Sequence, residues 1–550
     1  MRKRTSRLFI AAVLSALAIL FGAGHVLAYL SPSNPAVQTA DPEQIKYMDP
    51  AYLNDYTATP DPTYVIGPYK IPDYISTPNW ANSPPIRKFI DHLAPLGCDQ
   101  TNDLGQCIPV AVPDIVTYPG SDYYELELVE FTEQMHADLP ATTLRGYRQV
   151  NAGTDQSGGC TDPIQAIPNS CTDANNTDVT AVNAGAHFLG PIIVSQKDRP
   201  VRIKFINSLP VGAGGKLMVP VDTSIMGAGP YEIDYNPETN EPMALTTGNF
   251  TENRGLLHLH GGRTPWISDG TPHQWITPAG ENTDYPVGVS KTNVPDMPDP
   301  GPGAQTYYYT NQQSSRLLFY HDHSWGITRV NIYVGEAAGY VIRDATEQAL
   351  IDNDIIPGTK SDGTTLSYAG EMPLVFTDKT YVDADPTSPT YVLKTDPTWR
   401  WGSEAADGSG VVPPKTGDLW WPHIYMPAQN PFDVTGIAPM GRWAYGPYFW
   451  PATNNFFQPI PNPYYDASCD ATNPAQTDAN QNGLLNGFCQ PPEIPSTPNP
   501  SWGAEAFMDT PLVNGTAYPV LEVEPKPYRF RVLNASHDRF INLHMYIADL

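Results

Sequence analysis

Two closely spaced histidine pairs are the residues best suited to chemistry in this sequence. Among twelve histidines, His258 and His260 lie in GLLHLHGG, and His321 and His323 lie in LLFYHDHSWG. On a strand, residues i and i+2 point to the same face about 6.5 to 7 Å apart, so each pair directs two imidazoles toward one place. Imidazole binds copper, zinc, iron and nickel, so the pairs predict a metal site without selecting the metal. The alternative interpretation is two ordinary strands with exposed or hydrogen-bonded histidines, which two such pairs disfavour.

The elements that must position these histidines are predicted to be strands. Residues 122–131 and 201–207 alternate apolar with polar side chains, the pattern of a strand with one buried face. The 59 prolines and 43 glycines among 550 residues suit short strands joined by many turns and exclude an all-helical fold. Residues 200–207 and 527–534 share a proline, an arginine, a basic residue and an asparagine in step. We therefore expect one β-unit to occur twice, with the second starting near residue 371 and incomplete at residue 550.

Charge and composition exclude two classes of protein. The chain has 31 Lys and Arg against 58 Asp and Glu, a formal charge of −27, so nucleic acid is not expected as a partner. Hydrophobic residues make up 41%, enough to fill real cores, so the chain is not expected to be disordered.

The N-terminus predicts export. Arg2, Lys3, Arg4 and Arg7 precede an apolar run that starts at Leu8, which is the pattern of a secretory signal over residues 1–28. An uncleaved membrane anchor is the alternative. We expect the body to be periplasmic, on the outer surface or secreted, with no membrane contact after cleavage of the signal.

The six cysteines form three pairs that are local in sequence: Cys98 with Cys107, Cys160 with Cys171, and Cys469 with Cys489. An even count in an exported chain predicts three disulfides. A zinc site is the competing interpretation, and it is disfavoured because no C-x-x-C spacing occurs and no histidine is close to these cysteines in sequence.

A wider pattern surrounds the histidine pairs. The segments HLHGGRTPWISDGTPHQW (258–275) and FYHDHSWGITRVNIYVGEAAGYVIRD (319–344) resemble the first two copper motifs of multicopper oxidases. The resemblance extends through residues 135–147, 189–210, 371–381 and 527–543, covers roughly residue 87 to the end, and is closest to the bacterial spore-coat laccase and bilirubin oxidase branch.

This resemblance implies a fold and a set of ligands. The family fold is three tandem cupredoxin sandwiches, with a trinuclear copper cluster held by eight histidines between the first and third. By position in the motifs, His258 resembles the ligand of the type 2 copper, and His260, His321 and His323 resemble ligands of the type 3 pair. Asp269 resembles the acidic residue that moves protons during oxygen reduction; its alternative role is that of a turn-forming Asp-Gly.

The chain departs from the family pattern in one respect. The two later motifs, which bring four further histidines and the His-Cys-His of the type 1 copper, have no counterpart here. Four imidazoles are too few for three copper ions. We therefore expect the chain to be the N-terminal part of a longer oxidase, inactive alone, with the third domain in cis or, less simply, on a second chain.

The predicted organisation is all-β, with tandem cupredoxin-like Greek-key sandwiches and long Pro- and Gly-rich loops. We assign residues 1–28 to the signal, 29–117 to a Pro- and Tyr-rich arm, 118–345 to domain 1 with both histidine motifs, and 360–550 to an incomplete domain 2.

The resemblance implies oxidation of a phenol, a bilirubin-like pigment or a metal ion, coupled to reduction of dioxygen to water. The alternative functions are a non-enzymatic extracytoplasmic copper-binding or copper-delivery protein, and a structural sandwich with incidental histidines. The 12 methionines are scattered, which disfavours copper delivery by thioethers. Residues 478–483 match half of a calcium loop, but Cys489 replaces the expected glutamate.

Overall fold

The computed structural model describes most of residues 81–545. The described ranges are 81–153, 185–392, 415–424 and 508–545, apart from positions 99, 220, 222–226, 230, 232–247, 363–365, 368–369, 422 and 538, together with Ser468 and short strands between residues 460 and 502. The predicted signal, the Cys160–Cys171 and Cys469–Cys489 pairs and the calcium candidate at 478–483 lie outside the described residues.

The chain divides into two compact units. The first comprises Met1–Asn79, Tyr425–Gly436 and Tyr445–Thr497, and the second contains the rest. The strands described in the first unit form two short antiparallel pairs: β13 (Ile460–Pro461) with β16 (Glu493–Ile494), and β14 (Leu484–Leu485) with β15 (Phe488–Cys489). The second unit carries the histidine motifs and is described below.

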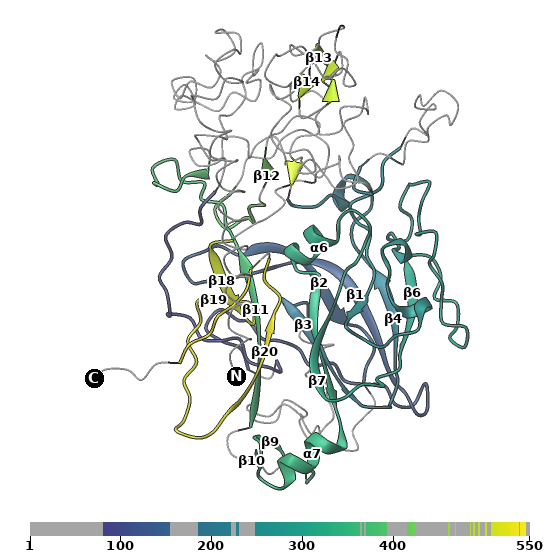
Figure 1. The fold of residues 1–550 in the computed structure, drawn as a ribbon, viewed down its shortest axis with the longest axis vertical. Coiled ribbons are helices and arrows are strands. Elements are labelled where there is room, and N and C mark those ends of the chain that lie inside the picture. The colour runs from purple at the N-terminus through teal and green to yellow at the C-terminus, as the bar shows by residue number, and fades with distance from the viewer. Residues whose placement is uncertain are drawn as a thin grey trace, which may run out of the picture. The chain divides into compact units, whose positions relative to one another are not determined.

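The first large sheet of the second unit has four strands in the order β2-β1-β4-β6 (Figure 1). They are β1 (Asp122–Glu133), β2 (Thr142–Gln149), β4 (Val201–Asn207) and β6 (Ala304–Tyr309). β4 alternates strictly between buried and half-buried residues, as its sequence predicts. The pairing of β1 with β4 is parallel, whereas the other two pairings are antiparallel.

The second sheet holds His258, His260 and His321, with His323 just after its strand β7, and packs on the first. Its order is β3-β8-β7-β5, with β3 (Leu189–Gln196), β8 (Ala337–Arg343), β7 (Arg316–His321) and β5 (His258–His260). One buried cluster joins the two sheets: Leu126 and Phe205 from the first sheet share it with Leu259 and Tyr320 from the second. These two sheets form a β-sandwich, which confirms the predicted all-β, cupredoxin-like fold class.

A third sheet contains the second copy of the repeat. Its order is β19-β18-β11-β20, with β11 (Glu371–Lys379), β18 (Thr510–Val513), β19 (Thr516–Ala517) and β20 (Arg529–Asn534). β20 runs parallel to β11, just as β4 runs parallel to β1, and each central strand has an antiparallel neighbour on its other side. Each repeated segment therefore lies beside the corresponding strand, β1 or β11, but β4 is an inner strand of its sheet and β20 is an edge strand.

The two copies differ in which face they bury. In β4 the apolar residues are buried, but in β20 Arg531 is buried while Phe530 and Val532 are 45% and 47% exposed. The reason is that the inner face of this sheet meets buried glutamates, which pair with the arginines.

Short elements complete the second unit. They are η3 (Gly212–Gly215), η4 (Trp266–Ser268), η5 (Pro272–Gln274), α6 (Thr328–Val334), α7 (Ala345–Asp352), β9 (Gly358–Thr359) with β10 (Leu366–Ser367), and β12 (His423–Ile424) with β17 (Ser501–Trp502). Among the described residues, no helix is both long and apolar enough to cross a bilayer. The predicted Cys98–Cys107 disulfide is present, with an S–S distance of 2.00 Å.

Candidate metal centre

The pairing of β5 with β7 brings the two histidine motifs together. The strands are antiparallel, with His258 directly opposite His321 and His260 opposite Phe319. β5 is the edge strand of its sheet and has only three residues. The hydroxyl of Tyr307, from the facing sheet, accepts a hydrogen bond of 3.0 Å from the backbone N–H of Leu257 and so fixes the start of β5.

The four predicted imidazoles converge. The ring centroid of His258 lies 5.8 Å from that of His260, 5.3 Å from that of His321 and 5.0 Å from that of His323. One nitrogen from each of His258, His260 and His321 lies within 4.8 Å of the others, and such a group can hold a metal ion. His323 belongs to the same ring cluster, although its nitrogens lie outside that three-donor group.

Hydrogen bonds orient two of these rings. Nδ1 of His258 lies 2.5 Å from the carbonyl oxygen of Asp269, and Nδ1 of His321 lies 2.5 Å from the carbonyl oxygen of Asp322. A carbonyl can only accept, so each Nδ1 carries the proton and each Nε2 keeps its lone pair. This arrangement of a ring fixed through one nitrogen is typical of metal-bound histidine.

The remaining nitrogens are placed for shared ligation. Nδ1 of His260 lies 3.0 Å from Nε2 of His321, so these two nitrogens point at the same place. The ring of His260 stacks on Phe319, with centroids 4.8 Å apart, and this contact fixes its plane. Nδ1 of His323 is buried and has no hydrogen-bond partner among the described residues. An unpartnered buried nitrogen suits a metal ligand, since burial without a partner is otherwise costly.

Burial keeps the imidazoles in the form that binds metals. It lowers the pKa of His321 to about 3 and lowers the pKa of His258, in both cases against the smaller opposing effect of the carbonyl hydrogen bond. Metal ligation requires a neutral imidazole, so these two rings need not lose a proton when a metal binds at neutral pH. The donor set, four imidazoles in a partly buried cluster, therefore fits the predicted copper.

Asp269 lies next to this cluster, at the end of η4. Its carbonyl holds His258, while its carboxylate oxygen Oδ1 accepts a 2.5 Å hydrogen bond from the hydroxyl of Thr264. Gly270 follows with φ +68°, and a Cβ there would lie 2.0 Å from the carbonyl oxygen of Leu257. The Asp-Gly turn thus has a structural role in positioning β5. A role of the carboxylate in proton transfer stays a prediction.

Two buried acids near the cluster were not predicted from the sequence. Asp322 is completely buried and accepts hydrogen bonds from the backbone N–H of Leu256 and from Ser324 and Asn331, so it ties the chain before β5 to α6. Glu336 is also completely buried. The burial of Asp322 could have been predicted from its position between His321 and His323. Side chains alternate along an extended chain, so the residue between two ligands faces away from the metal and into the protein.

The other histidines described lie apart from this cluster. His273 contacts Trp325 in a tilted ring pair with centroids 4.8 Å apart. His136 is completely buried and bonds the carbonyl of Arg87 at 2.7 Å. His187 lies beside the Cys98–Cys107 disulfide.

Comparisons with known proteins give a consistent result. No family model matches the chain. A laccase from Bacillus subtilis is 25% identical over 440 residues, covering 80% of this chain and 50% of the laccase. The multicopper oxidase LPR1 homolog 1 from Oryza sativa is 24% identical over 362 residues, covering 66% of this chain and 37% of the homolog. The bilirubin oxidase of Albifimbria verrucaria is 34% identical over 102 residues, covering 16% of this chain and 18% of the oxidase.

A solved structure, the McoA multicopper oxidase from Aquifex aeolicus, aligns with 78% of this chain and 46% of its own at 16% identity. The TM-score of this alignment is 0.30. The chain spans about half the length of the Bacillus laccases that it matches. The relatives and the convergence of both histidine motifs support one assignment: this chain is similar to multicopper oxidases over most of its length.

Proposed function

We propose that the protein is a laccase-like copper oxidase. It would take single electrons from a reducing substrate and use four of them to reduce dioxygen to water at a trinuclear copper cluster. The observation that carries this proposal is the convergence of His258, His260 and His321, whose donor nitrogens lie within 4.8 Å of one another. Relatives named laccase and bilirubin oxidase support it.

In this proposal the chain supplies half of the cluster. His258 would bind the type 2 copper, and His260, His321 and His323 would bind the type 3 pair. The other four histidines and the type 1 site would come from a third domain, in the same polypeptide or, less simply, on a second chain. The chain described here, tested alone, would then have little or no oxidase activity.

Copper bound there would supply the one-electron redox chemistry that side chains lack. The residues of this chain would hold the metal and control protons. Burial keeps His258 and His321 neutral and limits access of water. The Oδ1 atom of Asp269, hydrogen-bonded to Thr264, is the atom that we propose to hold and pass a proton during oxygen reduction.

The reducing substrate would be a phenol, a bilirubin-like pigment or a metal ion. The formal charge of −27 favours cations by raising their concentration near the surface. We also propose an extracytoplasmic location, periplasmic, on the outer surface or secreted, because the first 28 residues have the pattern of a secretory signal.

Replacing single ligands tests the assignment. In the complete protein, His260→Ala or His323→Ala should abolish oxygen uptake while leaving the type 1 colour, because electrons would still enter but could not be passed to oxygen. His273→Ala is the matched control, since His273 lies near the first motif but contacts the ring of Trp325 outside the cluster, and it should retain uptake. Normal oxygen uptake in both ligand variants would refute the assignment.

Metal counting separates this proposal from the alternatives. The complete protein, purified with copper, should contain copper and consume oxygen with a phenol as reductant. Bound copper without oxygen uptake would instead indicate a copper-binding or copper-delivery protein. A protein that binds no copper would be a structural sandwich.

A further inference from the structure

A second group of metal-binding side chains lies outside the histidine cluster. Cys98, Cys107 and His187 each contribute one ligand atom, and these three atoms lie within 4.8 Å of one another. The two cysteines form the disulfide described above. His187 is 80 residues from Cys107, so only the fold brings it to this pair of cysteines.

The backbone holds the two cysteines together independently of the disulfide. The N–H of Gly97 donates to the carbonyl of Ile108, and the N–H of Ile108 donates to the carbonyl of Pro95, both at 2.8 Å. Inside the loop, Oδ1 of Asn102 accepts hydrogen bonds from the backbone of Leu104 and Gln106. Reduction of the disulfide would therefore leave both thiols close to where the sulfurs are now.

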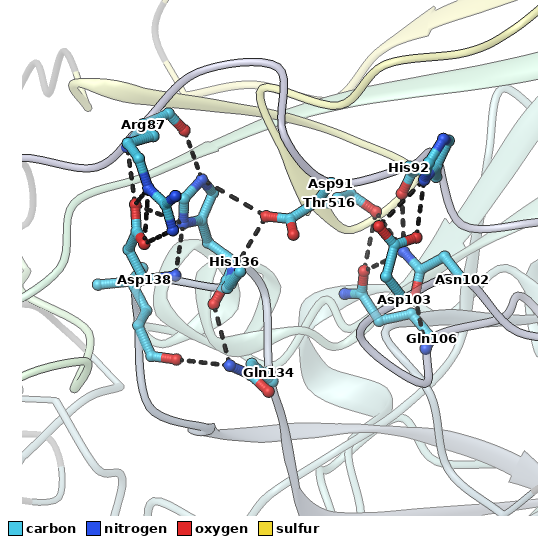
Figure 2. A network of polar contacts seen from close by, with 12 residues as sticks. Arg87, Asp91, His92, Asn102, Asp103, Gln106, Gln134, His136, Asp138 and Thr516 are labelled. Atoms are coloured by element: carbon cyan, nitrogen blue, oxygen red, sulfur yellow. Dashed lines mark hydrogen bonds and ion pairs between the residues drawn. The ribbon is translucent and has the colours of Figure 1, made fainter.

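The same loop is anchored to the hairpin of β18 and β19. Gln106 donates from Nε2 to the carbonyl of Gly515 and accepts from the hydroxyl of Thr516, at 2.9 and 2.8 Å. Figure 2 shows Asn102, Gln106 and Thr516 meeting in one polar network, beside the pair formed by His92 and Asp103. These contacts fix the loop on its scaffold without any contribution from the sulfur atoms.

His187 is oriented by a carboxylate. Nδ1 of His187 lies 2.6 Å from Oε1 of Glu133, and the other oxygen, Oε2, accepts a 2.9 Å hydrogen bond from the backbone N–H of Phe188. Glu133 is almost fully buried at the end of β1. A buried carboxylate that fixes an imidazole in this way is the usual support of a metal-binding histidine.

We propose that Cys98, Cys107 and His187 form a copper(I) site when the disulfide is reduced. Two thiolates and one imidazole are soft donors that suit copper(I), and a set of three donors suits it better than zinc, which takes four ligands in structural sites. In the oxidised state the same cysteines staple the loop. Reduction of the disulfide would thus convert a covalent cross-link in this loop into a metal site.

The chemistry balances without a redox change at copper. A trialkylphosphine and one water molecule reduce the disulfide to two thiols and yield the phosphine oxide. Copper(I) then displaces one proton from each thiol, so binding releases two protons and forms two Cu–S bonds and one Cu–N bond. In the protein's own surroundings a small thiol would take the place of the phosphine by thiol–disulfide exchange.

The test compares oxidised and phosphine-reduced protein after removal of the phosphine and titration with copper(I) under nitrogen against a chromophoric copper(I) chelator. In protein whose other four cysteines, Cys160, Cys171, Cys469 and Cys489, are replaced by serine, the reduced form should bind one more copper(I) per chain than the oxidised form, with a new near-ultraviolet thiolate-to-copper band. Copper bound to the histidine cluster contributes equally to both samples, so it does not affect the difference in bound copper between them. The experiment therefore does not depend on the proposed oxidase activity.

Variants identify the ligands. His187→Asn keeps the disulfide and should weaken the additional site at least about tenfold, and Glu133→Gln should weaken it by about 10- to 100-fold. Cys107→Ser should remove the band. His92→Asn is the matched control, because His92 bonds Asp103 on the same loop and should leave the affinity unchanged. Equal copper binding before and after reduction, or unchanged affinity in His187→Asn, would overturn the proposal.

Discussion

At the scale of single residues, Glu336 is the most unusual group near the histidine cluster. Both of its carboxylate oxygens are buried without a hydrogen-bond partner among the described residues. Burial raises its pKa well above the ordinary value of 4.5; the charge of Asp322 raises it further, and that of Arg145 opposes the shift. A carboxyl group in this setting is more stable protonated than charged.

The raised pKa of Glu336 predicts how stability depends on pH. The unfolded chain ionises this group near pH 4.5 while the folded chain stays protonated, so its contribution to stability is full below pH 4.5 and is lost as pH rises. Glu336→Gln cannot ionise. We expect the variant to equal the wild type near pH 4 and to be more stable by about 1 to 3 kcal/mol near pH 8, measured by urea unfolding. A gap that is constant from pH 4 to 8 would contradict this.

At the scale of elements, the Asp-Gly turn after η4 positions the edge strand β5. A methyl group at position 270 would collide with the backbone of Leu257 and His258, at 2.0 Å from the carbonyl oxygen and 3.0 Å from the Cα atom. Because backbone atoms cannot move aside cheaply, Gly270→Ala should shift β5 and weaken copper binding by at least about tenfold, measured by competition with a chelator.

Gly280→Ala is the control for the turn. Gly280 also has a positive φ, of +85°, but a Cβ there meets nothing within 4 Å. This variant carries the strain of a left-handed alanine, about 1 kcal/mol, without the collision. It should lose some stability and keep full copper affinity. Equal copper affinity in the two variants would show that β5 does not depend on the turn.

The sequence predicted the strands and the histidine site better than their surroundings. The alternation of apolar and polar residues predicted β4 at its observed bounds. It predicted the start of β1 correctly and its end two residues too early. The pattern works because each strand has one buried face. The i, i+2 spacing placed His258 and His260 on one face of β5, whereas His323 follows the end of β7 and joins the ring cluster from outside the strand. Local pattern could not predict that Arg531 is buried or that His187 lies near Cys98, since both depend on contacts between distant segments.

At the scale of the molecule, the third sheet is joined to the sandwich by a buried ion cluster. Glu347 in α7 and Glu371 at the start of β11 are held by Arg343 at the end of β8 and by Arg529 and Arg531 of β20. The exposed fractions of the two glutamate side chains are 5% and 0%. Three cations share two carboxylates, so loss of either carboxylate leaves buried positive charge uncompensated.

Glu371→Gln should therefore destabilise the second unit by about 3 to 5 kcal/mol, the usual cost of breaking a buried ion pair on one side, in urea unfolding at neutral pH. The control Asp354→Asn removes the exposed partner of Lys360 and should cost less than about 1 kcal/mol.

Because Glu347 binds the same arginines, the double variant Glu347→Gln with Glu371→Gln should depart from additivity by about 0.5 kcal/mol or more. Additive costs would mean that the two glutamates act separately. The sheet would then be attached to the sandwich mainly by apolar contacts, such as those in the buried cluster that contains Val375 of β11 and Leu144 of β2.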